Sequence, residues 1–201
     1  MKKLSLYIVL LLLLAATNAY SQKTVSKDNY ASQVQKEEGD LNHDKQNDKV
    51  MVEMDLKDEA RPLRLQIFLS QPDKKLQMVV SSTKIIESQY PTNKGEHNGN
   101  PIPDFFIEDG KLKMLTDINN RKSNYEFRLK QNNFELIKIS RVLWDGKNKT
   151  FETEIDLIAK TKIEFEQELG SDEILNKRST KIKVSSLPKI QDLSFSDLEQ
   201  Y

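Results

Sequence analysis

One stretch of the chain has residue types and spacing that could bind a metal ion, the sequence EGDLNHDKQNDKVMVEMD at residues 38–55. Side-chain oxygens recur at Asp40, Asn42, Asp44 and Asp48, which are positions 1, 3, 5 and 9 of a possible loop. The backbone carbonyl of Gln46, at position 7, could add another oxygen. Ca²⁺ takes about six to eight oxygen ligands from carboxylates, amides, carbonyls and water. These five residues are therefore predicted to ligate a structural Ca²⁺ ion.

This stretch resembles the DxNxDGxxD calcium loop of FG-GAP/VCBS-type repeats and, more distantly, the loops of dockerins and EF-hands. The likeness fails at position 6, where Lys45 replaces the glycine that a left-handed turn favours, at a cost on the order of 1 kcal/mol. Met51 stands at position 12, where an EF-hand has a bidentate glutamate, so the FG-GAP-like loop is the better match. An Asx-rich turn that feeds a strand without any ion explains the same residues.

A wider resemblance joins most of the chain to secreted bacterial proteins of unassigned function that carry one such loop. It runs through residues 127–130, 134–137 and 153–162, where the order and spacing of the blocks agree. Asp156 and Lys160 depart from the pattern. The resemblance implies secretion and a β architecture, and it implies no reaction.

The elements that must position the loop have the period-two hydrophobic pattern of half-buried antiparallel strands. The alternating residues include Val50, Val52 and Met54; Leu63, Leu65, Ile67 and Leu69; Tyr125, Phe127 and Leu129; and Ile163 and Phe165. Hairpin turns are predicted at Asp109-Gly110 and at Asn132-Asn133. We expect a mainly β (or α+β) fold: one domain over residues 38–201, sandwich- or meander-like, with little helix.

Composition excludes several classes of function. Among 201 residues, 31 Lys and Arg balance 31 Asp and Glu, and there is no Cys. A nucleic-acid binder carries a basic footprint, so no nucleic-acid partner is expected. Without cysteine the chain has no thiol catalysis, thiolate metal site, disulfide or lipobox anchor. The two histidines, His43 and His97, are too few for a His-based zinc site.

The first residues of the chain have the pattern of a targeting signal. Lys2 and Lys3 precede an apolar run over residues 4–16, followed by small and polar residues, as in a secretory signal peptide. We predict a signal peptide at 1–21, cleaved after Ala19 or Ser21, and a disordered leader at 22–37. The run is shorter than the roughly 20 residues that span a bilayer. The mature protein is expected to be periplasmic or extracellular and to have no membrane span.

Three functions fit these features. The first is a non-enzymatic binding or accessory protein of the cell envelope, with a protein or glycan partner. The second is an envelope hydrolase that uses the 90–103 loop and acids near 90–109, such as Asp104 and Glu108. The third is an inhibitor or immunity-type protein that blocks a partner enzyme. Phe105, Phe106 and Trp144 are expected in the core rather than on a ligand-stacking surface.

Overall fold

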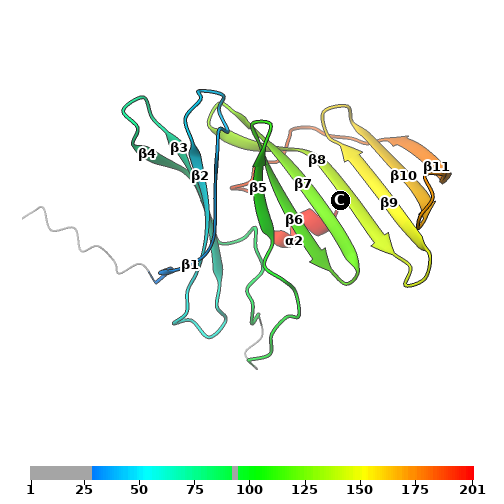
Figure 1. The fold of residues 1–201 in the computed structure, drawn as a ribbon, viewed down its shortest axis with the longest axis horizontal. Coiled ribbons are helices and arrows are strands. Elements are labelled where there is room, and N and C mark those ends of the chain that lie inside the picture. The colour runs from blue at the N-terminus through cyan, green and yellow to red at the C-terminus, as the bar shows by residue number, and fades with distance from the viewer. Residues whose placement is uncertain (1–28, 92–94) are drawn as a thin grey trace, which may run out of the picture.

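A computed structural model describes residues 29–91 and 95–201, and in them the chain forms two antiparallel sheets (Figure 1). The four-stranded sheet contains β1 (Ser32–Gly39), β2 (Asp48–Met54), β3 (Leu63–Ser70) and β4 (Leu76–Ser82). The seven-stranded sheet contains β5 (Asp104–Glu108), β6 (Lys111–Ile118), β7 (Arg121–Lys130), β8 (Asn133–Trp144), β9 (Lys149–Asp156), β10 (Thr161–Glu168) and β11 (Ile174–Lys181). Within each sheet every strand pairs with its neighbour along the sequence, so the predicted antiparallel β class is confirmed, with a meander in each sheet.

The local pattern of the sequence explains these strands. In β2 and β3 every second side chain is buried, and Val50 and Val52 lie beside their cross-strand partners Ile67 and Leu65 on the same face of the sheet. This is the period of a sheet that has one face covered.

Several hairpins are joined by tight turns in which two successive residues have positive φ. The β5–β6 turn uses Asp109 (φ 52) and Gly110 (φ 68), as predicted. The β7–β8 turn uses Gln131 (φ 48) and Asn132 (φ 60), one residue earlier than the predicted pair. Two central residues at positive φ match the right-handed twist of the flanking strands.

The predicted disordered leader at 22–37 is wrong for residues 32–37, which belong to β1. No side chain of β1 is fully buried, so its sequence lacks the apolar alternation from which a strand could be predicted. Its order comes from main-chain pairing with β2 and from a hydrogen bond that Gln35 Nε2 donates to the Phe105 carbonyl, at 3.2 Å. The predicted signal peptide at 1–21 and residues 22–28 of the leader lie outside the described residues.

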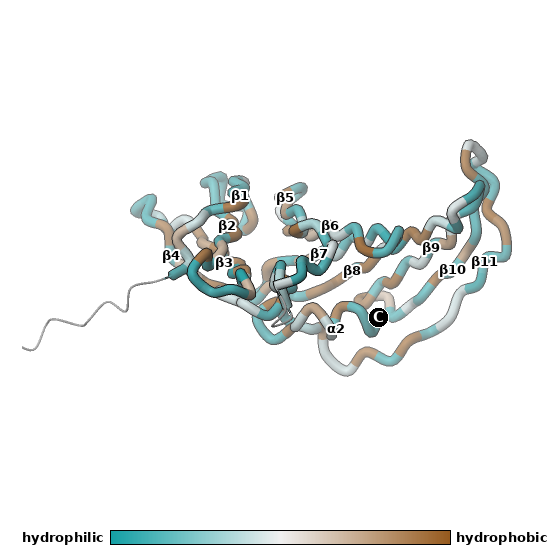
Figure 2. The backbone as a smooth tube through the Cα atoms, turned by 90° about the horizontal axis from the view of Figure 1, so that it is seen from below, coloured by the Kyte–Doolittle hydropathy of each residue, from teal (hydrophilic) through white to brown (hydrophobic). Residues whose placement is uncertain are grey.

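The C-terminal strap, residues 182–201, lies along one face of the seven-stranded sheet (Figure 2). Ile190 donates its N–H to the carbonyl of Phe134, and Leu136 donates to that of Pro188. The strap ends in the helix α2 (Phe195–Glu199), which Ser194 and Asp197 begin with a capping box. Buried residues of both sheets and of the strap form one hydrophobic core.

The described residues include no helix that has both the length and the apolar character needed to cross a membrane.

Candidate functional site

The loop between β1 and β2 is organised around the carboxylate of Asp40. Its Oδ1 accepts hydrogen bonds from the N–H groups of Asn42 and Asp44, both at 3.2 Å, and its Oδ2 accepts one from Lys45 at 2.8 Å. Burial tends to raise the pKa of Asp40, but the backbone N–H groups of the loop together outweigh it and lower the pKa. Asp40 is therefore a stably ionised group at the start of the loop.

Asn42, Asp44 and Gln46 continue the same network. Asn42 Oδ1 accepts from the N–H of Asp44 at 3.0 Å, and Asn42 Nδ2 donates to Asp44 Oδ2 at 3.0 Å. The N–H of Gln46 donates to Asp44 Oδ1 at 2.8 Å. The structure thus brings together four of the five predicted ligands, as successive Asx turns.

The sharp turn of this loop is left-handed at two residues. Lys45 has φ 68, the conformation predicted for position 6 although the residue is not glycine. His43 has φ 62, which the sequence reasoning missed. Non-glycine residues in this region cost about 1–3 kcal/mol each, so the hydrogen bonds to Asp40 and Asp44 must hold the backbone there.

Asp48, the fifth predicted ligand, has its carboxylate turned inward, where it bonds the backbone at the start of the loop and on β3. It is fully buried; its Oδ2 accepts the N–H of Leu41 and its Oδ1 accepts the N–H of Ser70, both at 2.8 Å. Burial raises the pKa of Asp48, and the nearby charges of Asp44 and Asp40 raise it further, while the two N–H groups oppose the shift. Asp48 fastens the end of the loop to β3.

The loop concentrates negative charge without a cationic partner. In the part of the chain that the structure describes, no salt bridge joins Asp40, Asp44 or Asp48 to a lysine or arginine. Nor do three or more His, Cys, Asp or Glu side chains converge as a metal centre among residues 29–91 and 95–201. The inward turn of Asp48 leaves two carboxylates, Asp40 and Asp44, on the loop, and amide and carbonyl oxygens would have to complete any ligand set.

The loop lies against the second sheet. A Cβ added to Gly110, in the β5–β6 turn, would lie 2.1 Å from Cε1 of His43, so the imidazole occupies the space that a side chain at residue 110 would need. A Cβ added to Gly39 would lie 2.8 Å from Cγ2 of Ile107. The loop and the end of β1 therefore pack directly against the β5–β6 hairpin of the second sheet.

A double-mutant cycle tests this contact. Gly110→Ala is expected to lower the free energy of unfolding by about 2 kcal/mol, because it adds a steric clash to the strain of a positive φ. Gly146→Ala is the matched control, since Gly146 has φ 80 and nothing within 4 Å of an added Cβ; it is expected to cost about 1 kcal/mol. Urea unfolding measures both, and His43→Ala should remove most of the difference. Equal losses for the two glycine variants would contradict the contact.

The acids proposed for a hydrolase do not form a pair. Asp104 and Glu108 are the first and last residues of β5, and four residue steps along the strand separate their Cα atoms by roughly 13 Å. Paired carboxyl groups of glycosidases lie about 5–9.5 Å apart. The ion pair with Lys113 lowers the pKa of Glu108, the opposite of the shift that a general acid needs.

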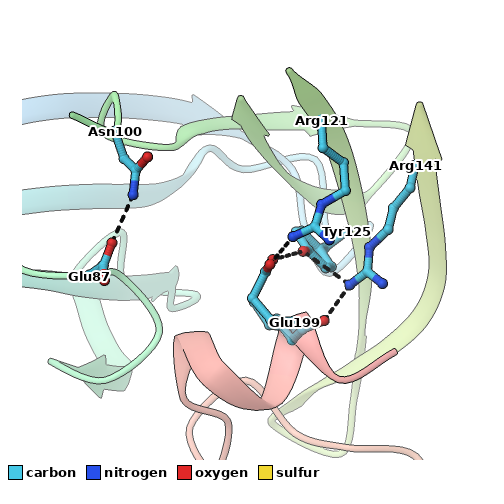
Figure 3. Close-up of polar contacts among 7 residues, drawn as sticks. Glu87, Asn100, Arg121, Tyr125, Arg141 and Glu199 are labelled. Carbon is cyan, nitrogen blue, oxygen red and sulfur yellow. Dashed lines mark hydrogen bonds and ion pairs between the residues drawn. The ribbon is translucent and has the colours of Figure 1, made fainter. Parts of the chain in front are cut away.

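The segment before β5 is tied together by its own side chains. Glu87 Oε2 accepts hydrogen bonds from Nδ2 of Asn98 at 3.1 Å and of Asn100 at 3.0 Å; the second is drawn in Figure 3. His97 Nε2 lies 2.9 Å from Gln89 Oε1. Residues 92–94 lie outside the described residues. In the described part of this loop the polar groups satisfy one another rather than form a reactive constellation.

A polar cluster that the sequence reasoning missed fixes the strap (Figure 3). Arg141, which is buried, donates to the carbonyl of Leu198, and Arg121 forms an ion pair with Glu199. The hydroxyl of Tyr125 lies 3.3 Å from Glu199 Oε1. The partners in each pair are at least 57 residues apart in sequence, so no local motif could have predicted them. The cluster anchors α2 to the seven-stranded sheet.

Two of the three aromatic residues expected in the core are on the surface. Phe105 is buried, as predicted, whereas Phe106 and Trp144 are each 44% exposed. Their side chains alternate with those that face the strap, and therefore lie on the opposite face of the seven-stranded sheet.

Comparison with models of protein families, with curated proteins and with solved structures finds no match to this chain.

Proposed function

We propose that the chain is an exported, non-enzymatic binding or accessory protein whose 40–48 loop holds a structural Ca²⁺ ion. Asp40, Asn42 and Asp44 would supply side-chain oxygens, and Gln46 a backbone carbonyl. Asp48 would keep the exit of the loop fixed to β3. The ion would stabilise the first hairpin and its contact with the second sheet.

The observation that carries the proposal is the uncompensated charge of the loop. Asp40 and Asp44 accept hydrogen bonds from backbone N–H groups and side-chain amides alone, and no ion pair neutralises them in the described chain. Their charges add to the burial that raises the pKa of Asp48. A carboxylate retains free lone pairs after accepting one or two N–H groups, so these oxygens can still ligate a hard cation.

A binding role is supported by the far end of the seven-stranded sheet. Large apolar side chains are exposed there: Trp144, Leu169 and Ile174 on the face away from the strap, and Leu143 and Phe151 on the other face. Groups of exposed apolar residues on a soluble protein commonly mark interaction sites.

Thermal unfolding with and without calcium tests the proposal. A ligand that binds only the folded state raises the melting temperature, and we expect an increase of about 5 °C or more at saturating Ca²⁺ over excess EDTA. Asp40→Asn and Asp44→Asn should each abolish the increase. Asp73→Asn, in the exposed turn between β3 and β4, is the control and should leave it unchanged. Superimposable melting curves in calcium and EDTA would refute the calcium loop.

A further inference from the structure

The face of the seven-stranded sheet opposite the strap carries a groove. Tyr125 and Arg141 face the strap, and the residues that alternate with them face the other way. Figure 2 shows the strap and α2 on one side of this sheet; in the described chain no element covers the other side. A hollow of about 380 Å³ lies there, lined by Asp117, Lys122, Val142, Trp144, Thr150 and Leu169.

A second hollow, of about 300 Å³, extends the first toward β5. It shares Asp117, Lys122 and Val142 with the first and adds Ile102 and Asn124. The two hollows therefore form one groove that runs across β6, β7 and β8.

Trp144 is a fixed apolar platform at one end of the groove. Its Nε1–H donates to the carbonyl of Lys147 at 3.3 Å, which fixes the orientation of the indole. The side chain is nevertheless 44% exposed. With its polar group already bonded to the protein, the ring can offer only its π face and edges to a ligand.

The other side of the groove is polar and electrically balanced. Lys122 Nζ lies 3.9 Å from Asp117 Oδ2, and both side chains are largely exposed. Asn124 Oδ1 is buried and has no hydrogen-bond partner in the part of the chain that the structure describes. A buried acceptor left unpaired costs about 1–3 kcal/mol, which a ligand hydroxyl reaching it would recover.

We propose that this groove binds a neutral oligosaccharide. A sugar ring has an apolar C–H face, which suits the indole of Trp144, and hydroxyl edges, which suit Asp117, Lys122 and Thr150. A phosphate-bearing ligand would need an excess of positive charge, and an aliphatic chain would leave the Lys122–Asp117 side unsolvated. The inference rests on the proposed binding role and names the class of ligand that the role requires.

Trp144 is the single tryptophan of the chain, so tryptophan emission, excited at a wavelength that the six tyrosines barely absorb, reports on the groove. The full protein is titrated separately with cellohexaose, chitohexaose and maltohexaose, in calcium and again in EDTA. A saturable change in emission with at least one hexasaccharide is expected. No change with any of the three would overturn the proposal.

Calorimetry on variants locates the site. Trp144→Ala should weaken binding roughly tenfold to hundredfold, because a central aromatic contact contributes about 1–3 kcal/mol. Phe151→Ala is the matched control: it removes an aromatic side chain of similar exposure from the neighbouring strand, on the face turned toward the strap. Equal weakening by both variants would contradict the assignment to this groove.

The same samples separate this inference from the proposed function. If the emission changes and the hexasaccharide is recovered intact, both stand. If the emission changes and reducing ends accumulate, the groove stands and the non-enzymatic role fails. If the hexasaccharide still binds in EDTA and the melting temperature is the same with and without calcium, the groove is upheld and the calcium loop is rejected.

Discussion

Asp48→Ala is expected to lower the free energy of unfolding by about 3–4 kcal/mol, even in the absence of calcium. The carboxylate is fully buried and accepts the N–H groups of Leu41 and Ser70, each at 2.8 Å. Removing it leaves two buried donors unpaired, at about 1–3 kcal/mol each. Urea unfolding in EDTA measures the effect.

Asp48→Asn separates hydrogen bonding from side-chain volume. The amide keeps one acceptor and replaces the other with an NH₂ donor, which must face an N–H. Its expected loss is about 2 kcal/mol, smaller than that of the alanine variant. Asp73→Asn, at an exposed turn, should stay within about 0.5 kcal/mol of the parent. An Asp48→Asn protein as stable as the parent would show that one of the two hydrogen bonds is dispensable.

Leu198→Ala is expected to destabilise the fold by about 3 kcal/mol and to loosen the strap. Leu198 is the buried residue of α2, and its side chain is fully enclosed by the core. A helix of five residues is too short to be stable without such packing. Hydrogen exchange should accelerate at Leu136 and Ile190, whose N–H groups join the strap to β8.

The control for this variant is Gln200→Ala, which alters an exposed position two residues further along the same segment. It should change neither stability nor exchange at Leu136 and Ile190. If Leu198→Ala lowers stability but leaves their exchange protected relative to the rest of the sheet, α2 does not hold the strap in place.

Period-two alternation was sufficient to predict the buried strands and the antiparallel class. In β2 and β3 the apolar side chains must all lie on the buried face of the sheet. Because side chains alternate between the two faces, apolar residues must recur at every second position of the sequence. The same argument fails for β1, which is held by main-chain pairing and by the Gln35 contact, and whose side chains are all polar or partly exposed. A strand without a buried face leaves no periodic signal.

The spacing of the loop residues predicted a left-handed turn at Lys45, because local chemistry decides it. It did not predict that Asp48 would turn inward, since the N–H group of Ser70 comes from β3, 22 residues away. The surface position of Trp144 was missed for a similar reason: which face of β8 is covered depends on where the strap lies. Contacts between distant segments cannot be read from spacing.

Isothermal titration of Ca²⁺ into the chelator-treated protein tests the central claim most directly. The account predicts one site per chain, with binding abolished by Asp40→Asn and by Asp44→Asn and retained by Asp73→Asn. Absence of a saturable heat, or a heat that the Asp40 and Asp44 variants leave unchanged, would contradict it. The loop would then be an Asx-rich turn that holds β1, β2 and the β5–β6 hairpin together without an ion.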